Sequence, residues 1–326
     1  MENPKIIEFQ MTRDFGSKVS TTFAFVVQNY RGLLRSILYI AGPPVLVASL
    51  LLSSFVADIF SLGLQTGRGN QDAFLKYFTN VNFWLQIGLA LIFFIVSLVV
   101  TTATLNNYLI LYREKKTHQI EVSDVWERVR NTFWMYLGTT LLFGLLAIVA
   151  YILLTIPIIV FAAISPFLIF FGAVLLIIGI LYLVVTTSLV YVVQAFEHKG
   201  FFESIARSFY LVRGKWWSTF GLYMVLSMLV GVISSIFIFP AYIIMIVQSL
   251  HNVQTNDFQG PSGITGTVVL IFITLYYLSQ MVLSCLPNIG LALQYFNLVE
   301  MKEAKGLLGQ IETLGQSSSP STEEHY

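Results

Sequence analysis

The chain has 326 residues, of which 56% are hydrophobic and 11% are charged, and its formal net charge is +1. Soluble domains are about 25% charged, so this composition excludes an ordinary water-soluble domain. The near-neutral charge gives no global basic field for nucleic acid, and the single cysteine excludes an intramolecular disulfide and any site built from several cysteines.

The apolar residues come in six long runs, which we interpret as membrane-spanning helices. A helical span needs about 20 consecutive apolar residues, and lipid forces its backbone hydrogen bonds to be made within the segment. The predicted spans cover residues 33–57, 83–112, 132–163, 167–196, 216–247 and 267–298. The fold class expected from this pattern is an all-α, multi-pass membrane protein, because a membrane β-barrel would show weak alternation instead of long runs.

In chain order, residues 1–32 form an amphipathic N-terminal arm, residues 33–298 the six-span domain, and residues 299–326 a short helix with a tail. Pro43-Pro44 should kink the first span, because prolines remove backbone donors. A polar loop is expected over residues 58–82. The Ser- and Glu-rich end of the tail has a composition that stays disordered.

The basic residues give each connecting segment a side. All Lys and Arg residues except Arg68 and Lys76 fall in the N-terminal segment up to Arg35, in the loops after the second and fourth spans, or after the sixth span. The loops after the third and fifth spans contain none. The positive-inside rule therefore predicts a protein of the cytoplasmic membrane with both termini in the cytoplasm.

Each odd-numbered span is preceded by apolar residues three or four positions apart, which predicts an amphipathic helix. The three stripes are Phe15, Val19, Phe23, Val26, Tyr30 and Leu33; Val122, Val125, Trp126, Val129 and Phe133; and Phe202, Ile205, Phe209 and Val212. Met301, Ala304, Leu308 and Ile311 suggest a further short helix after the sixth span. Each apolar face either lies in the headgroup layer or packs on the cytoplasmic end of the bundle. An amphipathic helix followed by a helical hairpin would then occur three times, which raises the hypothesis of a threefold repeat.

No catalytic or metal-binding constellation is visible. Membrane enzymes and ion-coupled transporters usually bury ionisable groups in their spans, whereas the acidic residues and the four histidines here lie outside the apolar centres. The histidines also lack the spacing of metal ligands. We therefore expect no catalytic residues, no metal site and no cofactor, and a protein that is not an enzyme.

Basic and aromatic residues gather in front of the fifth span. They are Arg207, Arg213, Lys215, Trp216 and Trp217. Cationic groups next to interfacial tryptophans are suited to an anionic lipid headgroup. An aromatic belt that only anchors the helix explains the two tryptophans equally well.

A second group places polar side chains toward the predicted cytoplasmic ends of the even-numbered spans. Its members are Asn106, Asn107, Gln194 and Gln294. Hydrogen bonds between helices are the simpler interpretation. A polar cavity or a headgroup site at the inner mouth of the bundle is the alternative.

Residues 203–217 contain Arg207-Ser208, Leu211-Val212 and Gly214-Lys215-Trp216-Trp217 and run directly into the fifth span. This stretch resembles bacterial multi-span proteins related to the membrane domain of glycerophosphoryl diester phosphodiesterases. The close of the sixth span, residues 294–304, resembles membrane proteins of the Bacteroidetes type. The resemblance implies a bacterial inner-membrane protein. It does not imply phosphodiesterase activity, which in that family belongs to a separate soluble barrel for which this chain has no room.

These observations favour a non-enzymatic membrane module that organises lipids or partner proteins through its basic cytoplasmic side. The alternative is a permease for a neutral or lipidic substrate, with the polar residues at the span ends lining its path. A polar cavity reaching the middle of the bilayer would favour the permease, and a dry, apolar centre would favour the module. The expected partners are membrane lipids and other membrane or cytoplasmic proteins, and not nucleic acid. The sequence leaves the oligomeric state undetermined.

Overall fold

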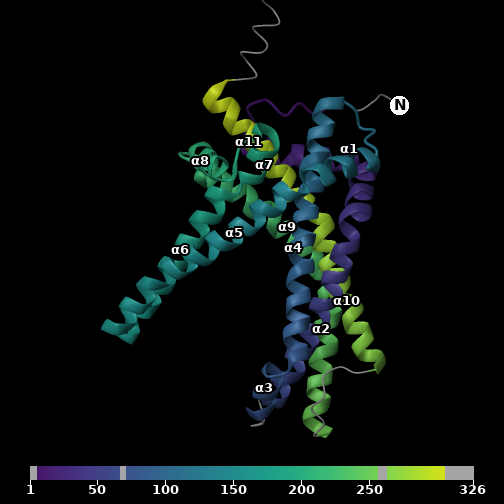
Figure 1. Ribbon diagram of the computed structural model, residues 1–326, viewed down its shortest axis with the longest axis vertical. Helices are drawn as coiled ribbons and strands as arrows, with labels where there is room; N and C mark the ends of the chain where they lie inside the picture. The colour runs from purple at the N-terminus through teal and green to yellow at the C-terminus, as the bar shows by residue number, and fades with distance from the viewer. Residues whose placement is uncertain (1–5, 67–70, 256–262, 305–326) are drawn as a thin grey trace, which may run out of the picture. The chain divides into compact units, whose positions relative to one another are not determined.

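The computed structural model describes residues 6–66, 71–255 and 263–304 (Figure 1). All regular secondary structure within these ranges is helical. Part of the predicted short helix after the sixth span, at Leu308 and Ile311, lies outside the described residues, as does the Ser- and Glu-rich tail.

Six helical stretches are long and apolar enough to cross a membrane, which confirms the predicted all-α, multi-pass fold. They are Phe15–Gly63, Val81–Lys115, Val122–Ile164, Pro166–Glu197, Trp216–His251 and Gly263–Glu303. The longest has 49 residues. At about 1.5 Å per residue such a helix exceeds the ~30 Å hydrocarbon core, so it extends beyond it, tilts or bends.

The chain forms two compact units, each assembled from stretches that are distant in sequence. The first unit comprises Met1–Gln28, Ala150–Met224 and Ile289–Tyr326, and the second comprises Asn29–Val149 and Val225–Asn288. Several long helices therefore contribute residues to both units.

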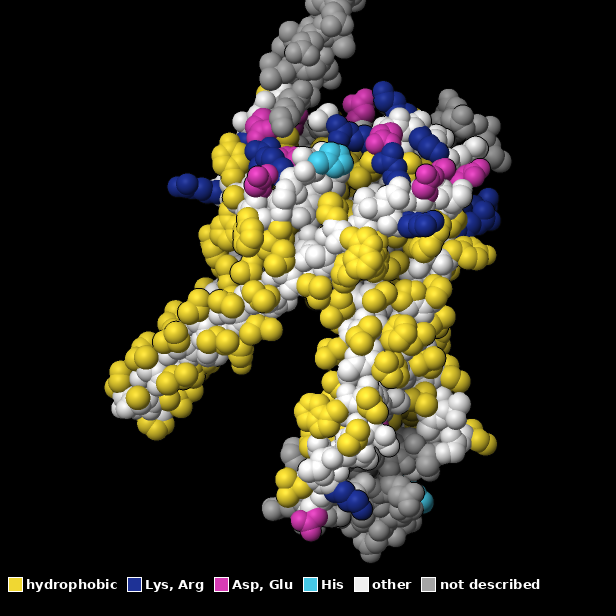
Figure 2. Space-filling view, in the orientation of Figure 1, with side chains coloured by type: hydrophobic (Ala, Val, Ile, Leu, Met, Phe, Trp, Pro, Cys, Tyr) yellow, Lys and Arg dark blue, Asp and Glu magenta, His cyan; other side chains and the backbone are white. Residues whose placement is uncertain are grey.

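In the second unit, helix α2 (Gly42–Thr66) packs against both α4 (Val81–Lys115) and α10 (Gly263–Leu283) (Figure 1). Apolar side chains fill the space between α10 and α9 (Trp216–Thr255), with Met245 and Ile273 buried in this cluster. The short helix α3 (Gln71–Phe78) precedes α4. Charged side chains lie over α3 in Figure 2, at one end of the apolar helices of this unit.

One prediction about the first span needs correction. The polar loop was expected to begin at Asp58, but α2 continues to Thr66, because residues 59–64 are still mostly apolar and the glycine breakers come later. The proline pair lies in the first turn of α2, directly after a π-helical turn, η1 (Ile37–Ala41). Pro43 and Pro44 cannot donate to carbonyls in the preceding turn, and a widened turn relieves that mismatch.

In the first unit, the last part of α5 (Val122–Ile164) and α6 (Ile169–Thr187) form an antiparallel hairpin across the 3₁₀ turn η2 (Pro166–Leu168). The helices approach closely at Gly172, where an added Cβ would come 2.7 Å from the Cα of Ile158. Hydrophobic side chains cover this hairpin along its length (Figure 2). A small residue at the contact and an apolar surface are typical of helix pairs packed in lipid.

The predicted fourth and sixth spans are each interrupted. Helix α6 ends at Thr187 and α7 (Val190–Glu197) follows, because the hydroxyls of Thr186, Thr187 and Ser188 bond back to carbonyls of the preceding turn and disturb the helix. Helix α10 gives way to α11 (Cys285–Glu303) at Ser284. Pro287, which lacks a backbone donor, explains this second break.

Candidate functional site

Helix α8 (Phe201–Val212) presents two different faces. Toward the protein it buries the small side chains of Ser204 and Ser208, and it packs there against α6 and α7. The Ser208 hydroxyl donates a hydrogen bond to the Thr186 carbonyl of α6. The predicted apolar stripe is divided: Phe202 is 69% exposed, Ile205 and Phe209 are partly buried, and Val212 is buried.

Helix α1 (Phe15–Ser36) repeats this arrangement. Its buried side contains Lys18, Thr22 and Phe25, whereas Phe15 and Phe23 of the predicted stripe are exposed. The sequence left open whether such helices contact lipid or the bundle. The structure shows both kinds of face on one helix. Small and polar side chains pack inward together with apolar ones such as Phe25 and Val212, whereas Phe15, Phe23 and Phe202 are exposed.

Arg207 on α8 is held by two carboxylates. Its guanidinium forms ion pairs with Glu197 at the end of α7, at 2.9 Å, and with Glu303 at the end of α11. The Tyr295 hydroxyl donates to the same Glu197 carboxylate at 2.8 Å, and Lys199 completes the cluster. We call Glu197, Lys199, Arg207, Tyr295 and Glu303 the carboxylate clasp.

The clasp neutralises Arg207. Its side chain is only 13% exposed. Hydrogen bonds to Glu303 and Glu197 raise the pKa of Arg207 above its ordinary value, although burial acts in the opposite direction. Arg207 was predicted to bind a lipid headgroup. In the structure its guanidinium is paired with two carboxylates, and both come from helices that the local sequence pattern does not include.

Lys18 is the most buried cation among the described residues of the first unit, and it lies in the segment that the sequence predicted only as an amphipathic arm. Its side chain is 3% exposed. The amine donates to Gln294 Oε1 at 2.7 Å and to Ser218 Oγ at 3.1 Å, and the Gln294 amide donates onward to Thr219. The available signal was the spacing of Lys18, Thr22 and Phe25, which defines a second helical face beside the apolar stripe.

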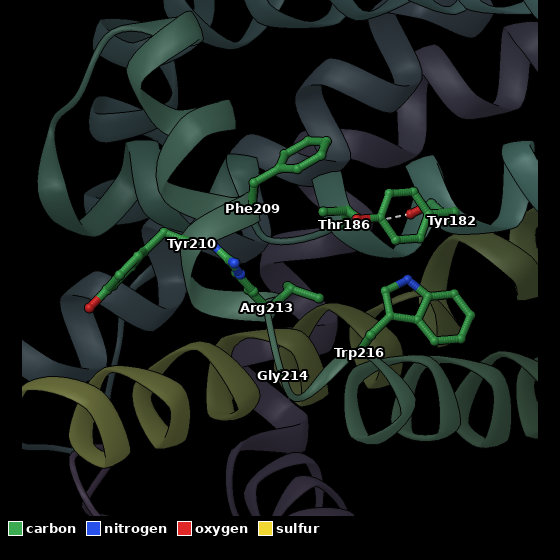
Figure 3. Close-up of a pocket in the computed structure, with 8 residues that line it drawn as sticks. Tyr182, Thr186, Phe209, Tyr210, Arg213, Gly214 and Trp216 are labelled. Atoms are coloured by element: carbon green, nitrogen blue, oxygen red, sulfur yellow. Dashed lines mark hydrogen bonds between the residues drawn. The ribbon is translucent and has the colours of Figure 1, made fainter.

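A pocket of about 460 Å³ lies where α6, α8 and the start of α9 meet (Figure 3). Its lining residues are Tyr182, Thr186, Phe209, Tyr210, Val212, Arg213, Gly214 and Trp216. The Trp216 indole stacks on Phe220, with ring centroids 5.2 Å apart, and its N–H is buried without a hydrogen-bond partner among the described residues. Figure 3 shows the indole on one side of the pocket and the Arg213 guanidinium on the other, near Tyr210.

The rim of this pocket carries uncompensated positive charge. Arg213 and Lys302 form no salt bridge within the described part of the chain, and they repel one another. The Lys302 amine donates to the carbonyls of Tyr210 and Arg213 and lies 4.5 Å from the centroid of the Tyr210 ring. Charged side chains gather over α8 and the end of α11 in Figure 2.

The predicted headgroup residues therefore separate into three groups. Arg213 and Trp216 line the pocket, and Arg207 belongs to the carboxylate clasp. Lys215 and Trp217 are exposed and are not among the lining residues. Lys302 was missed because it follows Arg213 by almost ninety positions and only the tertiary fold brings the two together.

The four polar residues at the span ends are all buried. The structure divides them: Asn106 and Asn107 belong to the second unit, and Gln194 and Gln294 to the first. Asn107 donates to the hydroxyl of Thr132 on α5 at 2.8 Å, and Gln294 connects Lys18 with Thr219. These bonds between helices match the simpler interpretation of both residues.

Within the described residues, no group of three or more His, Cys, Asp or Glu side chains is placed to hold a metal ion. His118 has its Nδ1 atom 3.3 Å from the side-chain oxygen of Asn29, a contact inside the second unit.

A family model described as a domain of unknown function matches residues 46–286, which is most of the chain. The matched region begins in α2 and ends at the start of α11, so it includes α8 and the Arg213–Trp216 pocket. Lys18, Lys302 and Glu303 lie outside it. No curated protein and no solved structure matches the chain.

Proposed function

Since the chain belongs to the DUF8558 family, a domain of unknown function, we propose its role from its own structure. It is a multi-pass membrane module without enzymatic activity. It binds anionic lipids at the charged end of its first unit. It also binds partner proteins there, either directly or through these lipids. We further propose that it lies in a bacterial cytoplasmic membrane with both termini inside, as the distribution of Lys and Arg residues favours.

The observation that carries this proposal is the outward aromatic face of α8 next to unneutralised cations. Phe202 is exposed, while the opposite face of the same helix is buried against α6 and α7. An amphipathic helix with Phe, Trp or Leu on its apolar face lies in the headgroup layer. Each nearby cation, such as Arg213 or Lys215, adds about 1 kcal/mol of attraction to an anionic leaflet.

The interior of the second unit favours the module over the permease. The cluster around Met245 and Ile273 is apolar. A pocket of about 410 Å³ between α2, α4 and α10 has mostly apolar walls, and its Gln86 amide already donates to Ser54. A neutral polar substrate would need a continuous series of hydrogen-bonding groups instead. The resemblance to the membrane domain of glycerophosphoryl diester phosphodiesterases is in keeping with a module that acts without its own catalytic site.

The orientation can be tested with reporter fusions after residues 70, 122, 205 and 257. We expect fusions after 122 and 205 to report the cytoplasm and those after 70 and 257 to report the opposite side. The reverse pattern would place the basic segments away from the anionic cytoplasmic leaflet and would refute this proposal.

The role of the outward face can be tested by extracting the full chain with its surrounding lipids and analysing the eluate for lipids and proteins. We expect enrichment of anionic lipid that falls when Phe202 and Ile205 are both replaced by Ser. A matched control is Val81→Ser, which removes an exposed apolar side chain at the start of α4. Equal lipid and protein profiles for all three chains would contradict a working surface on α8.

A further inference from the structure

The pocket between α6, α8 and α9 is lined by two polar groups that could bind a ligand. The Trp216 N–H is buried without an acceptor in the described part of the chain. The Arg213 guanidinium has no carboxylate partner there either. Buried polar groups in folded proteins nearly always have partners, so an unpaired donor on a residue that lines a pocket points to a ligand that supplies the acceptor.

We propose that this pocket binds one anionic phospholipid. Its phosphate lies at Arg213, and an oxygen of its glycerol or ester region accepts the hydrogen bond of the Trp216 indole. This inference rests on the proposed function and deepens it, because it replaces a general attraction to anionic membranes by a single site with two defined contacts.

Charge selects an anion at this site. Lys302 lies beside Arg213, donating to its carbonyl at 3.1 Å, and the two cations repel one another. Lys215 follows two positions later and is exposed. A phosphate between these groups would relieve the repulsion, and Arg provides the planar fork of donors that phosphate oxygens match. The carboxylates of the clasp do not compete with the ligand for Arg213, because they are already paired with Arg207.

The surroundings favour a lipid over a free phosphate. A volume of about 460 Å³ is in the range of small-molecule sites, and the walls include the aromatic rings of Tyr182, Phe209 and Trp216. Below Tyr182, the residues Ile178 and Leu175 follow at helical spacing, and all three are about half exposed. This stripe on α6 leads from the pocket along the apolar hairpin, which is a path that acyl chains can cover.

The test uses the full chain, purified in a neutral detergent and stripped of lipid. The protein is then titrated with phosphatidylglycerol, phosphatidylcholine or inorganic phosphate. Native mass spectrometry counts the bound lipid, and thermal unfolding is the second readout. The variants are Arg213→Gln and Trp216→Phe. Their matched controls are Arg130→Gln, an exposed arginine in the second unit, and Trp217→Phe, an indole that is 77% exposed.

We expect one phosphatidylglycerol to bind in preference to phosphatidylcholine. Arg213→Gln should weaken this binding about tenfold and Trp216→Phe about threefold, while both controls stay within about twofold of the unchanged chain. Trp216→Phe keeps the aromatic stack and removes only the unpaired donor. The lipid-free variant should therefore be as thermally stable as the unchanged chain, although it gains less stability from lipid.

Three results would overturn the site. The first is that Arg213→Gln and Arg130→Gln bind phosphatidylglycerol with equal affinity, and the second is that phosphatidylglycerol and phosphatidylcholine bind equally well. The third is that millimolar phosphate displaces phosphatidylglycerol and stabilises the chain as much as the lipid does. The last would assign a site for soluble phosphate. Each of these outcomes leaves the reporter orientation and the α8 lipid profile untouched, so failure of the pocket is distinguishable from failure of the proposed function.

Discussion

The charged end of the first unit and the apolar bundle of the second unit are held by different interactions. In the first unit, Arg207 joins α8 to the ends of α7 and α11, and Lys18 joins α1 to α9 and α11. In the second unit, α2, α4 and α10 pack mainly through apolar side chains. Helices in lipid gain little from the hydrophobic effect, so close packing holds an apolar bundle and paired polar groups select one arrangement. Removing a polar partner from the first unit should therefore cost more than a polar change in the second.

The largest effect is expected at the carboxylate clasp. Arg207→Met should lower the free energy of unfolding by about 3 kcal/mol, because it leaves Glu303 and Glu197 without their shared cation. Thermal unfolding of the full chain in detergent measures this. Replacing Glu303 by Gln in the same chain should restore part of the loss, and a fully additive double variant would show that the clasp does not act as a unit.

The next effect is expected at Lys18. Gln294→Leu removes the closest acceptor of a buried amine and should cost about 2 kcal/mol. Lys18→Met combined with Gln294→Leu removes both partners and should recover most of that loss, as thermal unfolding would show. No recovery in the double variant would mean that Gln294 acts through Thr219 alone.

The third largest effect is expected from disturbing the close packing of the α5–α6 hairpin. Gly172→Ala places a Cβ 2.7 Å from the Ile158 Cα, so α5 and α6 must separate, at an expected cost of about 1–2 kcal/mol in unfolding free energy. Gly144→Ala is the control on α5, since its added Cβ meets no atom within 4 Å. That control should be neutral or slightly stabilising by helix propensity, and equal destabilisation by both changes would argue against a specific contact.

The smallest effect is expected at a polar contact of the second unit. Burial and the nearby Asp58 carboxylate raise the pKa of Tyr77 to about 12, and its hydroxyl donates to Asp58 over a long 3.4 Å. Tyr77→Phe should change the unfolding free energy by less than about 0.5 kcal/mol at neutral pH. Since the unfolded tyrosine ionises first, near pH 10, the contribution is complete below that pH and is lost as the pH rises toward 12. Thermal unfolding from pH 9 to 11.5 should therefore fall more steeply for the unchanged chain, and parallel curves would contradict this.

The fold was predictable to the level of six spans because each span is encoded locally. A long apolar run is helical in lipid whatever its neighbours are, so span number and approximate position follow from run length. The breaks at Ser188 and Ser284 were not predicted. They depend on hydroxyl groups and on Pro287, which interrupt a helix without interrupting its hydrophobicity.

The candidate site was predictable only in part. The grouping of Arg213 and Trp216 next to the fifth span pointed to one region, and both residues line the same pocket. The pairing of Arg207 with Glu303 and the approach of Lys302 to Arg213 could not be predicted from the sequence. These partners lie about ninety positions apart and meet only when the end of α11 packs beside α8 within the first unit.

Composition and run length by themselves determined that this chain enters a membrane as helices, because transfer of an apolar segment into lipid depends on that segment alone. Tertiary structure decided which side of α1 and α8 faces the protein, which the apolar stripes had left open, and it placed Thr22, Ser204 and Ser208 on that side. It also decided which cations stay available for a ligand. The physical reason is the same in both cases. Burial of a helix face and neutralisation of a charge each depend on two segments, and the sequence of one segment does not determine which other segment it will contact.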